Sequence, residues 1–226
     1  MPDFPRGFEL AEALTAAARQ LHDTATPHST MSTAVGLAVR LVPGAEHATI
    51  SEAERGNHFR TLAWSDEVVR TAHDLQPDGE GAPYWDHLWH APVVHVADSE
   101  SDAGGSVPAG PGLRSALALR LRADKRRLTV LTVYARKPHA FDDAATRIGR
   151  LFTAHVGLAL DSVTVREQLT EAMHTRDLIG QATGILMERL NMDATEAFDS
   201  LVRASQRENV KLRDLARRIV DANHTT

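Results

Sequence analysis

The sequence contains no cysteine. This absence excludes a disulfide framework, catalysis by a thiolate, zinc sites with thiolate ligands and thioether attachment of a tetrapyrrole. No apolar run approaches the ~20 residues that are needed to span a bilayer. The first ten residues, Met1 to Leu10, lack the basic and apolar segments of a signal peptide. We therefore expect a protein of the cytoplasm.

An excess of positive charge is also missing. The formal net charge is -5, and charged residues make up 24% of the 226 positions. Any contact with nucleic acid must therefore come from a local basic face rather than from the whole surface. The hydrophobic share of 42% is enough for a packed core, and the length suits one ordinary domain with a smaller second one.

Apolar periodicity and turn residues predict a mixture of helices and strands. Helices are expected over residues 8–22, 29–42, 66–75, 84–90, 142–190, 193–208 and 211–222. Strands are expected over residues 47–53, 60–65, 92–97, 115–122 and 128–135, and surface loops over 76–83 and 98–112.

Three of these elements carry further expectations. In the hairpin 115–135, apolar and polar residues alternate, which predicts that one face of the sheet is wet. In the short helix 84–90, Trp85 and Trp89 are four residues apart and are expected to define its buried face. In the helix from 142 to 190, the length exceeds that of a typical globular helix and indicates a helix that bridges domains or pairs with another.

The sequence therefore predicts an α+β protein in which an antiparallel sheet with flanking helices is followed by a long helix and three carboxy-terminal helices. We expect a first domain over 8–160, a coiled-coil-like helical linker over 161–175 and a carboxy-terminal domain over 165–226.

The carboxy-terminal quarter carries the most specific motif. The segment Arg176 to Arg189, reading RDLIGQATGILMER, resembles the first-helix signature of the ANTAR family. Ala197-Phe198 and Leu201 are similar to its second helix, and the run from Ser205 to Ala216 is similar to the junction and third helix. The resemblance implies a transcription antitermination regulator that binds paired RNA stem-loops in nascent transcripts.

Carried onto this sequence, the resemblance and the residue types give a set of RNA-binding candidates. These are Arg176, Gln181, Ala182, Thr183, Gly184, Arg203, Ser205, Gln206, Asn209, Lys211 and Arg213. Polar edges and guanidinium planes suit single-stranded loop bases, and small residues such as Ala182 and Gly184 permit close approach. Thr183 stands where the family often has Lys. Phe198 is expected on the apolar stripe, which leaves no aromatic stacking platform.

The region 8–160 resembles GAF sensor domains, including those that precede ANTAR modules in actinobacterial regulators. The resemblance rests on Gly79 to Pro83, on the strand pair from Leu117 to Tyr134 and on Ala140-Phe141-Asp142. It implies a small-molecule ligand or a dimerisation role. The candidates for lining a ligand pocket are Trp64, Tyr84, Trp85, Trp89 and Tyr134. Tyr84 stands where relatives often carry Cys, so sensing by a thiol is not available.

Other chemistry finds little support. Asp86, His87, His90 and His95 have metal-like spacing, but His87 and His90 are expected at the edge of their helix or in solvent. No phosphate-binding loop of Walker type and no nucleophile elbow occur. The pair Asp142-Asp143 opens a helix, where carboxylates suit the helix dipole. We therefore predict no enzyme activity, no catalytic residue, no metal and no cofactor.

The function that follows is a cytoplasmic homodimer that senses a signal through its GAF-like domain and binds RNA through its ANTAR domain. One alternative is a GAF ligand sensor or dimerisation protein whose helical tail, with a solvated basic face, binds protein rather than RNA. A second alternative is a small enzyme on a GAF-like scaffold.

Overall fold

The computed structural model describes residues 4–55, 58–74, 83–100 and 112–224. The chain divides into two compact units, Met1–Thr164 and Val165–Thr226. One helix, α5 (Asp143–Leu190), contributes residues to both units. The two units are described separately below.

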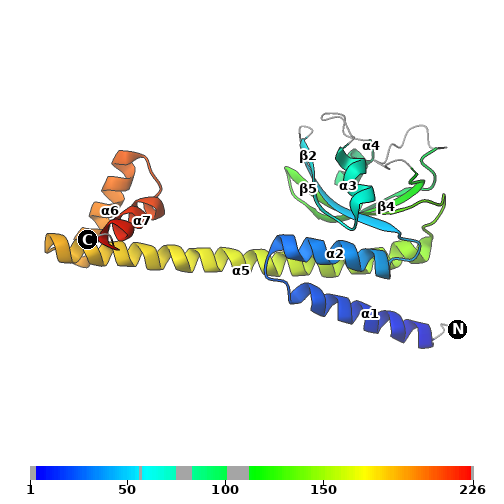
Figure 1. Cartoon of the computed structure of the whole chain (residues 1–226), viewed down its shortest axis with the longest axis horizontal. Helices are drawn as coiled ribbons and strands as arrows, with labels where there is room; N and C mark the ends of the chain where they lie inside the picture. Colours follow the sequence, from blue (N-terminus) through cyan, green and yellow to red (C-terminus); the bar gives the residue numbers. More distant parts are fainter. Residues whose placement is uncertain (1–3, 56–57, 75–82, 101–111, 225–226) are drawn as a thin grey trace. The chain divides into compact units, whose positions relative to one another are not determined.

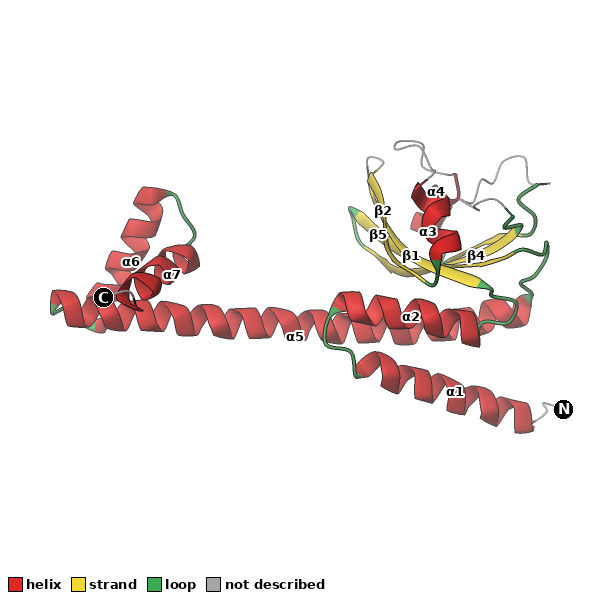
Figure 2. Ribbon diagram, viewed as in Figure 1, coloured by secondary structure: helices red, strands yellow, loops and turns green. Residues whose placement is uncertain are grey.

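The first unit is built on one antiparallel sheet (Figure 2). Its strands are β1 (His47–Glu54), β2 (His58–Trp64), β3 (Val93–Val96), β4 (Ser115–Ala123) and β5 (Arg127–Ala135), in the spatial order β2-β1-β5-β4-β3. The long strand β5 lies at the centre between β1 and β4, and its register with β1 pairs His47 with Tyr134 and Glu54 with Arg127. The predicted hairpin 115–135 is present as the β4–β5 pair.

One face of the sheet is covered by α2 (Pro27–Leu41) and the first part of α5, and α1 (Phe4–His22) packs against α2 on the side away from the sheet (Figure 1). Ile50 and Leu131 point into this layer, where they meet the fully buried Phe152 and Val156 of α5. These side chains form the main hydrophobic core, and burial of each contributes about 1.5–3 kcal/mol to stability.

The other face is covered as well, by α3 (Glu67–Asp74) and α4 (Pro83–His90). A second core gathers there, with Leu88 of α4, Val69 of α3 and Tyr134 of β5 all buried. The expectation that one face of the 115–135 hairpin is wet is therefore wrong. Every residue of β5 from Leu128 to Ala135 is buried, because two helical layers enclose the strand.

Helix α4 also differs from the sequence expectation. Leu88 is its fully buried residue, whereas Trp89 is half-buried and His87 and His90 are exposed. The side chain of Trp85 lies outside the described residues. Arg120 of β4 donates to the backbone oxygens of Leu88 and Trp89 at 3.2 and 3.1 Å. This explains why an arginine stands in a buried strand: it satisfies the carbonyl groups at the end of α4.

The helix boundaries follow local hydrogen bonding. Thr26 caps α2 in a capping box with Ser29, and Pro27 occupies the first turn, so this helix begins two residues before the expected Ser29. Helix α1 begins at Phe4, four residues earlier than expected. At α5, Asp142 Oδ1 accepts the backbone N–H of Ala145 at 2.8 Å. The expected start of the long helix near Asp142 and its end at Leu190 are confirmed.

The second unit consists of the last part of α5 with α6 (Ala194–Glu208) and α7 (Leu212–His224). Asn191 ends α5 with a left-handed φ of 51°, between the expected helices 142–190 and 193–208. Asp193 then caps α6 in a capping box with Glu196, the two hydrogen bonds measuring 2.9 and 3.3 Å. The α+β class, with a five-stranded antiparallel sheet followed by a long helix and carboxy-terminal helices, is confirmed.

Two glycines of the first unit give a matched test of the fold. A Cβ at Gly44 would lie 2.4 Å from the backbone oxygen of Ala140, and Gly44 has a φ of +83°. A Cβ at the exposed Gly36 of α2 would meet nothing within 4 Å. We predict that Gly44→Ala destabilises the unit by about 2 kcal/mol or more because of strain and overlap. Gly36→Ala should instead stabilise it by about 1 kcal/mol.

Urea unfolding followed by tryptophan fluorescence measures both effects, since the chain's 3 tryptophans all lie in this unit. Equal stability of the two variants would contradict the described turn at Gly44.

Candidate nucleic-acid interface

The second unit is held together by a small apolar core. Leu178 and Ala182 of α5, Leu201 of α6, and Leu215, Ala216 and Val220 of α7 are all buried in it. Ala182 has no exposed surface. Its side chain is therefore not available to RNA in this conformation, and its small size is explained by the close packing of the three helices. Thr183, one residue later, donates its hydroxyl to the Ile179 carbonyl at 2.8 Å.

The turn between α6 and α7 is fixed by two of the predicted RNA-binding residues. Asn209 ends α6 in the left-handed conformation, with φ 52° and ψ 41°. The buried Ser205 donates its hydroxyl to the Val210 carbonyl at 2.6 Å. Such a cap satisfies carbonyl groups at a helix end. Ser205 therefore shapes the turn, while the neighbouring Gln206, Asn209 and Lys211 are exposed.

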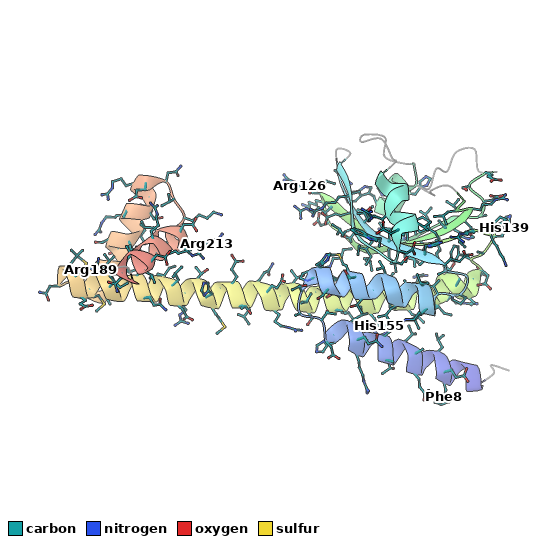
Figure 3. The ribbon with its side chains drawn as sticks, in the orientation of Figure 1. Phe8, Arg126, His139, His155, Arg189 and Arg213 are labelled. Atoms are coloured by element: carbon teal, nitrogen blue, oxygen red, sulfur yellow. The ribbon has the colours of Figure 1, made fainter. Side chains whose placement is uncertain are left out.

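The charges of this unit nearly cancel. From Val165 to Thr226 the sequence has nine Arg and Lys and ten Asp and Glu, a net charge of -1. Among the described residues only two of the nine cations have carboxylate partners. Arg213 pairs with Glu171 at 2.5 Å, and Arg218 pairs with Glu208 at 3.2 Å. Arg213 and Arg189, which donates to the Asn223 amide, are labelled in Figure 3.

The remaining cations have no carboxylate partner within the described part of the chain. They include three of the predicted RNA-binding residues, Arg176, Arg203 and Lys211, together with Arg207 of α6 and Arg217 of α7. All five are exposed. Arg203 donates to the Ser200 hydroxyl at 3.0 Å, which leaves its charge uncompensated. The unit therefore offers separate positive groups to a polyanion although its net charge is negative.

Two glycines leave one stretch of the α5 surface without side chains. Gly180 and Gly184 are exposed, and a Cβ added at either would meet nothing within 4 Å. Glycine inside a helix costs about 1 kcal/mol relative to alanine. Packing within the described residues gives no reason for either glycine. Gln181, another predicted residue, is exposed next to Gly180.

The second unit has a groove, and one of its lining residues, Phe198, lies on a different face of α6 from the one predicted. Phe198 of α6 is 43% exposed, so the expectation that it lies on the apolar stripe is wrong. The stripe passes through Ala197, Leu201 and Ser205 instead. The groove has a volume of about 550 Å³ and is lined by Gln168, Glu171, Ala172, Thr175, Arg176, Ile179, Phe198 and Arg213. A strict reading of the 3.6-residue period would have placed Phe198 about 100° from Ala197.

The aromatic residues predicted to line a GAF pocket have different surroundings. Trp64 is 41% exposed at the end of β2. Trp89 packs at the second core and lies beneath the Arg55 guanidinium, 5.0 Å from the ring centroid. Tyr134 is buried in that core. The side chains of Tyr84 and Trp85 lie outside the described residues. Only Trp89 and Tyr134 are thus seen at one cluster, and the predicted ligand contacts remain predictions.

The face of the sheet that α3 and α4 cover has buried polar groups that the sequence did not predict. The Tyr134 hydroxyl shares a 3.3 Å hydrogen bond with Thr49 Oγ1, and burial raises the pKa of Tyr134 to about 12. His47 Nδ1 lies 2.8 Å from Asp66 Oδ2. Burial opposes the charge of Asp66, but hydrogen bonds from Ser65 and His47 outweigh it and hold the Asp66 pKa below its ordinary value. His47 Nε2 is buried without a hydrogen-bond partner among the described residues.

The histidines that have metal-like spacing do not gather. His87 and His90 are exposed on α4, and His95 packs edge-on against Phe141 with ring centroids 6.5 Å apart. Among residues 4–55, 58–74, 83–100 and 112–224, no group of three or more His, Asp or Glu is arranged to hold a metal ion. Within the same ranges, no helix has the length and apolarity required to cross a membrane.

Comparison with protein-family models gives two matches. The GAF domain model matches residues 24–161, which is more than half of the chain. The ANTAR domain model matches residues 167–220. Comparison with curated protein sequences found no match.

Solved structures resemble the chain at low identity. A bacteriophytochrome from R. palustris has a TM-score of 0.59 and 12% identity, covering 79% of this chain and 43% of its own. The chromophore-binding domain of that protein has a TM-score of 0.52 and 11% identity, covering 70% of this chain and 63% of its own. The GAF domain of a phosphoenolpyruvate-protein phosphotransferase from Coxiella burnetii has a TM-score of 0.57 and 8% identity, covering 70% and 96%.

The chain thus spans less than two thirds of both bacteriophytochrome chains, and these similarities show the fold alone. Together with the five-stranded sheet and the helical second unit, the family-model matches show that the chain belongs to the GAF domain family and carries an ANTAR domain after its GAF domain.

Proposed function

We propose that this protein is a regulator of transcription antitermination rather than an enzyme. Its ANTAR domain binds paired RNA stem-loops in nascent transcripts in the cytoplasm, and its GAF domain receives the signal. ANTAR domains are RNA-binding antitermination modules and GAF domains are sensory domains, and both are present in this chain.

The proposal rests on a set of uncompensated cations in the second unit, Val165–Thr226, which is called the ANTAR unit from here on. The first unit, Met1–Thr164, is called the GAF unit. Arg176, Arg203, Arg207, Lys211 and Arg217 are exposed without carboxylate partners among the described residues. Phosphate contacts by such groups release counterions and supply much of the affinity for nucleic acid.

The bare segment of α5 supports the same proposal. An RNA backbone or base can approach a helix closely where side chains are absent, and Gly180 and Gly184 provide such a place next to Gln181. The cost of two glycines in a helix is then offset by binding rather than by packing.

We further propose that the protein acts as a homodimer through α5. In the first unit, Leu151 and Leu158 of α5 are 52% and 68% exposed; in the second unit, Val165 and Leu169 are each 61% exposed. Large exposed apolar side chains mark interaction surfaces. Leu151, Leu158 and Val165 are seven residues apart, the repeat along which two helices pair. A second copy of the chain fits best, because a two-fold axis brings the same residues together.

The protein-binding alternative predicts a different behaviour. If the helical tail binds protein, the exposed cations make no contact with RNA, and no stem-loop RNA should be retained at low ionic strength. The experiments below separate the two functions with the full chain. Their probe is a synthetic RNA of two stem-loops joined by a short linker, selected for tightest binding from a pool with randomised loops.

The first prediction concerns the cations. Arg203→Ala and Lys211→Ala should each weaken binding of the selected RNA by about tenfold. Each should also lower the slope of log affinity against log salt by about 1, because one phosphate contact is lost. Filter binding over a salt series measures both quantities. The control is Arg147→Ala, an exposed arginine of α5 in the first unit, which should change neither. Unchanged slopes in all three variants would favour the protein-binding alternative.

The second prediction concerns Gly184. Gly184→Ala should stabilise α5 locally by about 0.5–1 kcal/mol, which slows hydrogen exchange of the amides around residue 184. The same variant should bind the selected RNA more weakly, because the added methyl group occupies the face on which the RNA lies. Gly36→Ala in α2 is the control and should leave RNA affinity unchanged. Wild-type affinity in the stabilised Gly184→Ala variant would remove this segment of α5 from the interface.

The third prediction concerns the dimer. Light scattering should give about twice the chain mass of 24.7 kDa for the wild type. Leu158→Glu combined with Val165→Glu should give the monomer mass, because facing carboxylates cannot be buried together without a large cost. Val68→Glu, at an apolar residue of α3 that is 39% exposed, serves as the control and should remain dimeric. A monomeric wild type at tens of micromolar would refute self-association through α5.

A further inference from the structure

The exposed ring of Phe198 has no packing explanation within the ANTAR unit. Ala197, Leu201 and Ser205 face the core from α6, and Phe198 lies outside that stripe with 43% of its surface exposed. Its ring forms part of the wall of the 550 Å³ groove, opposite residues of α5. Leaving so large an apolar group in water forgoes stabilisation that burial would supply.

The groove combines an apolar wall with a polar and cationic rim. Phe198, Ile179 and Ala172 supply the apolar surface, while Gln168 and Thr175 supply hydrogen-bonding groups. Its volume of about 550 Å³ falls within the range of roughly 300–1,000 Å³ that is typical of small-ligand sites.

Two arginines also line the groove, and only one of them has a carboxylate partner. Arg176 has no carboxylate partner among the described residues, whereas Arg213 is held by Glu171 at 2.5 Å. The carboxylate of Glu171 is therefore neutralised, and the groove keeps the uncompensated charge of Arg176. This local charge is positive although the unit as a whole has a net charge of -1.

We propose that this groove holds one unstacked base from the loop of an RNA hairpin, with the base lying on the ring of Phe198. The inference rests on the proposed RNA-binding function and names the structural element by which a loop is recognised. Bases splayed from loops stack on aromatic rings and on guanidinium planes, and their edges form hydrogen bonds. Phe198 supplies the ring, Arg176 the cation for a neighbouring phosphate, and Gln168 and Thr175 the groups for the base edge.

The groove suits a base better than a helix of a second copy. Its exposed surface is mostly apolar, as the face of a base requires, while five of its eight lining residues carry polar or charged groups that can bond to a base edge or a phosphate. The large exposed apolar residues of α5 in this unit, Val165, Leu169, Met173, Met187 and Leu190, do not line the groove. The surface proposed for self-association and the groove proposed for the base therefore use different side chains.

The test distinguishes stacking of a base on an aromatic ring from contact of the RNA with any apolar side chain. Phe198→Leu keeps an apolar side chain without a π face, and Phe198→Tyr keeps the ring. On the selected two-hairpin RNA, Phe198→Leu should weaken binding about tenfold or more, whereas Phe198→Tyr should stay near wild type. Phe8→Leu makes the same change at another exposed phenylalanine, in the GAF unit, and should have no effect. Circular dichroism and light scattering check folding and mass for each variant.

A second arm removes the base instead of the ring. Each loop position of the RNA is replaced in turn by an abasic nucleotide, which keeps the phosphate. One position should weaken wild-type binding about tenfold, and on that RNA Phe198→Leu should cause no additional loss, because the ring and the base form a single contact.

The outcomes separate this inference from the proposed function. Equal affinity of Phe198→Leu and wild type would overturn the base site while leaving RNA binding intact. Equal losses on every abasic RNA would also overturn it, and so would a change of Phe198→Leu from dimer to monomer, which would assign the groove to a second copy. Failure of the wild type to retain any RNA from the pool would remove the proposed function itself.

Discussion

The whole structure depends on the packing of α5 in two separate cores. Phe152 and Val156 are fully buried beneath the sheet of the GAF unit, and Leu178 and Ala182 are buried among the ANTAR helices. Neither proline nor a left-handed residue interrupts the described helix from Asp143 to Leu190. One hydrogen-bonded helix therefore supplies apolar side chains that both units need. Exposed leucines lie between and beside these buried residues, and they are the physical basis for proposing self-association through α5.

The ANTAR unit shows why net charge is a poor guide to the positive groups that a protein surface offers to a polyanion. Acidic residues outnumber basic ones by one, yet only Arg213 and Arg218 are neutralised by carboxylates among the described residues. The pairing of Arg213 with Glu171 also changes the role expected of Arg213. From the sequence it is one more cation for a phosphate, but in the structure its guanidinium is held at the edge of the Phe198 groove. A charged residue contributes to a polyanion site only to the extent that its neighbours leave the charge uncompensated.

Most elements could be predicted because their signals are local. The alternation in 115–135, the turn chemistry, the break at Asn191 and the capping box of Asp193 with Glu196 all depend on residues within a few positions of each other. Errors appeared where the outcome depends on distant partners. The face of the hairpin expected to be wet is covered by α3 and α4, and Arg120 is accommodated there by the carbonyl groups of Leu88 and Trp89. No pattern within a strand reveals whether a second helical layer will cover it.

The sequence alone determined the α+β class, the order of the elements, the long helix and the family motif of the last sixty residues, because periodicity, capping residues and motif order are properties of neighbouring positions. It also identified the exposed cations such as Arg203 and Lys211. Tertiary structure decided which residues face solvent. The RNA-binding candidate Ala182 is in the core and Ser205 fixes a turn, whereas Phe198, which was expected on the apolar stripe, is exposed in the groove that Arg176 also lines. The physical reason is that burial and charge compensation are set by the residues that folding brings together from separate helices.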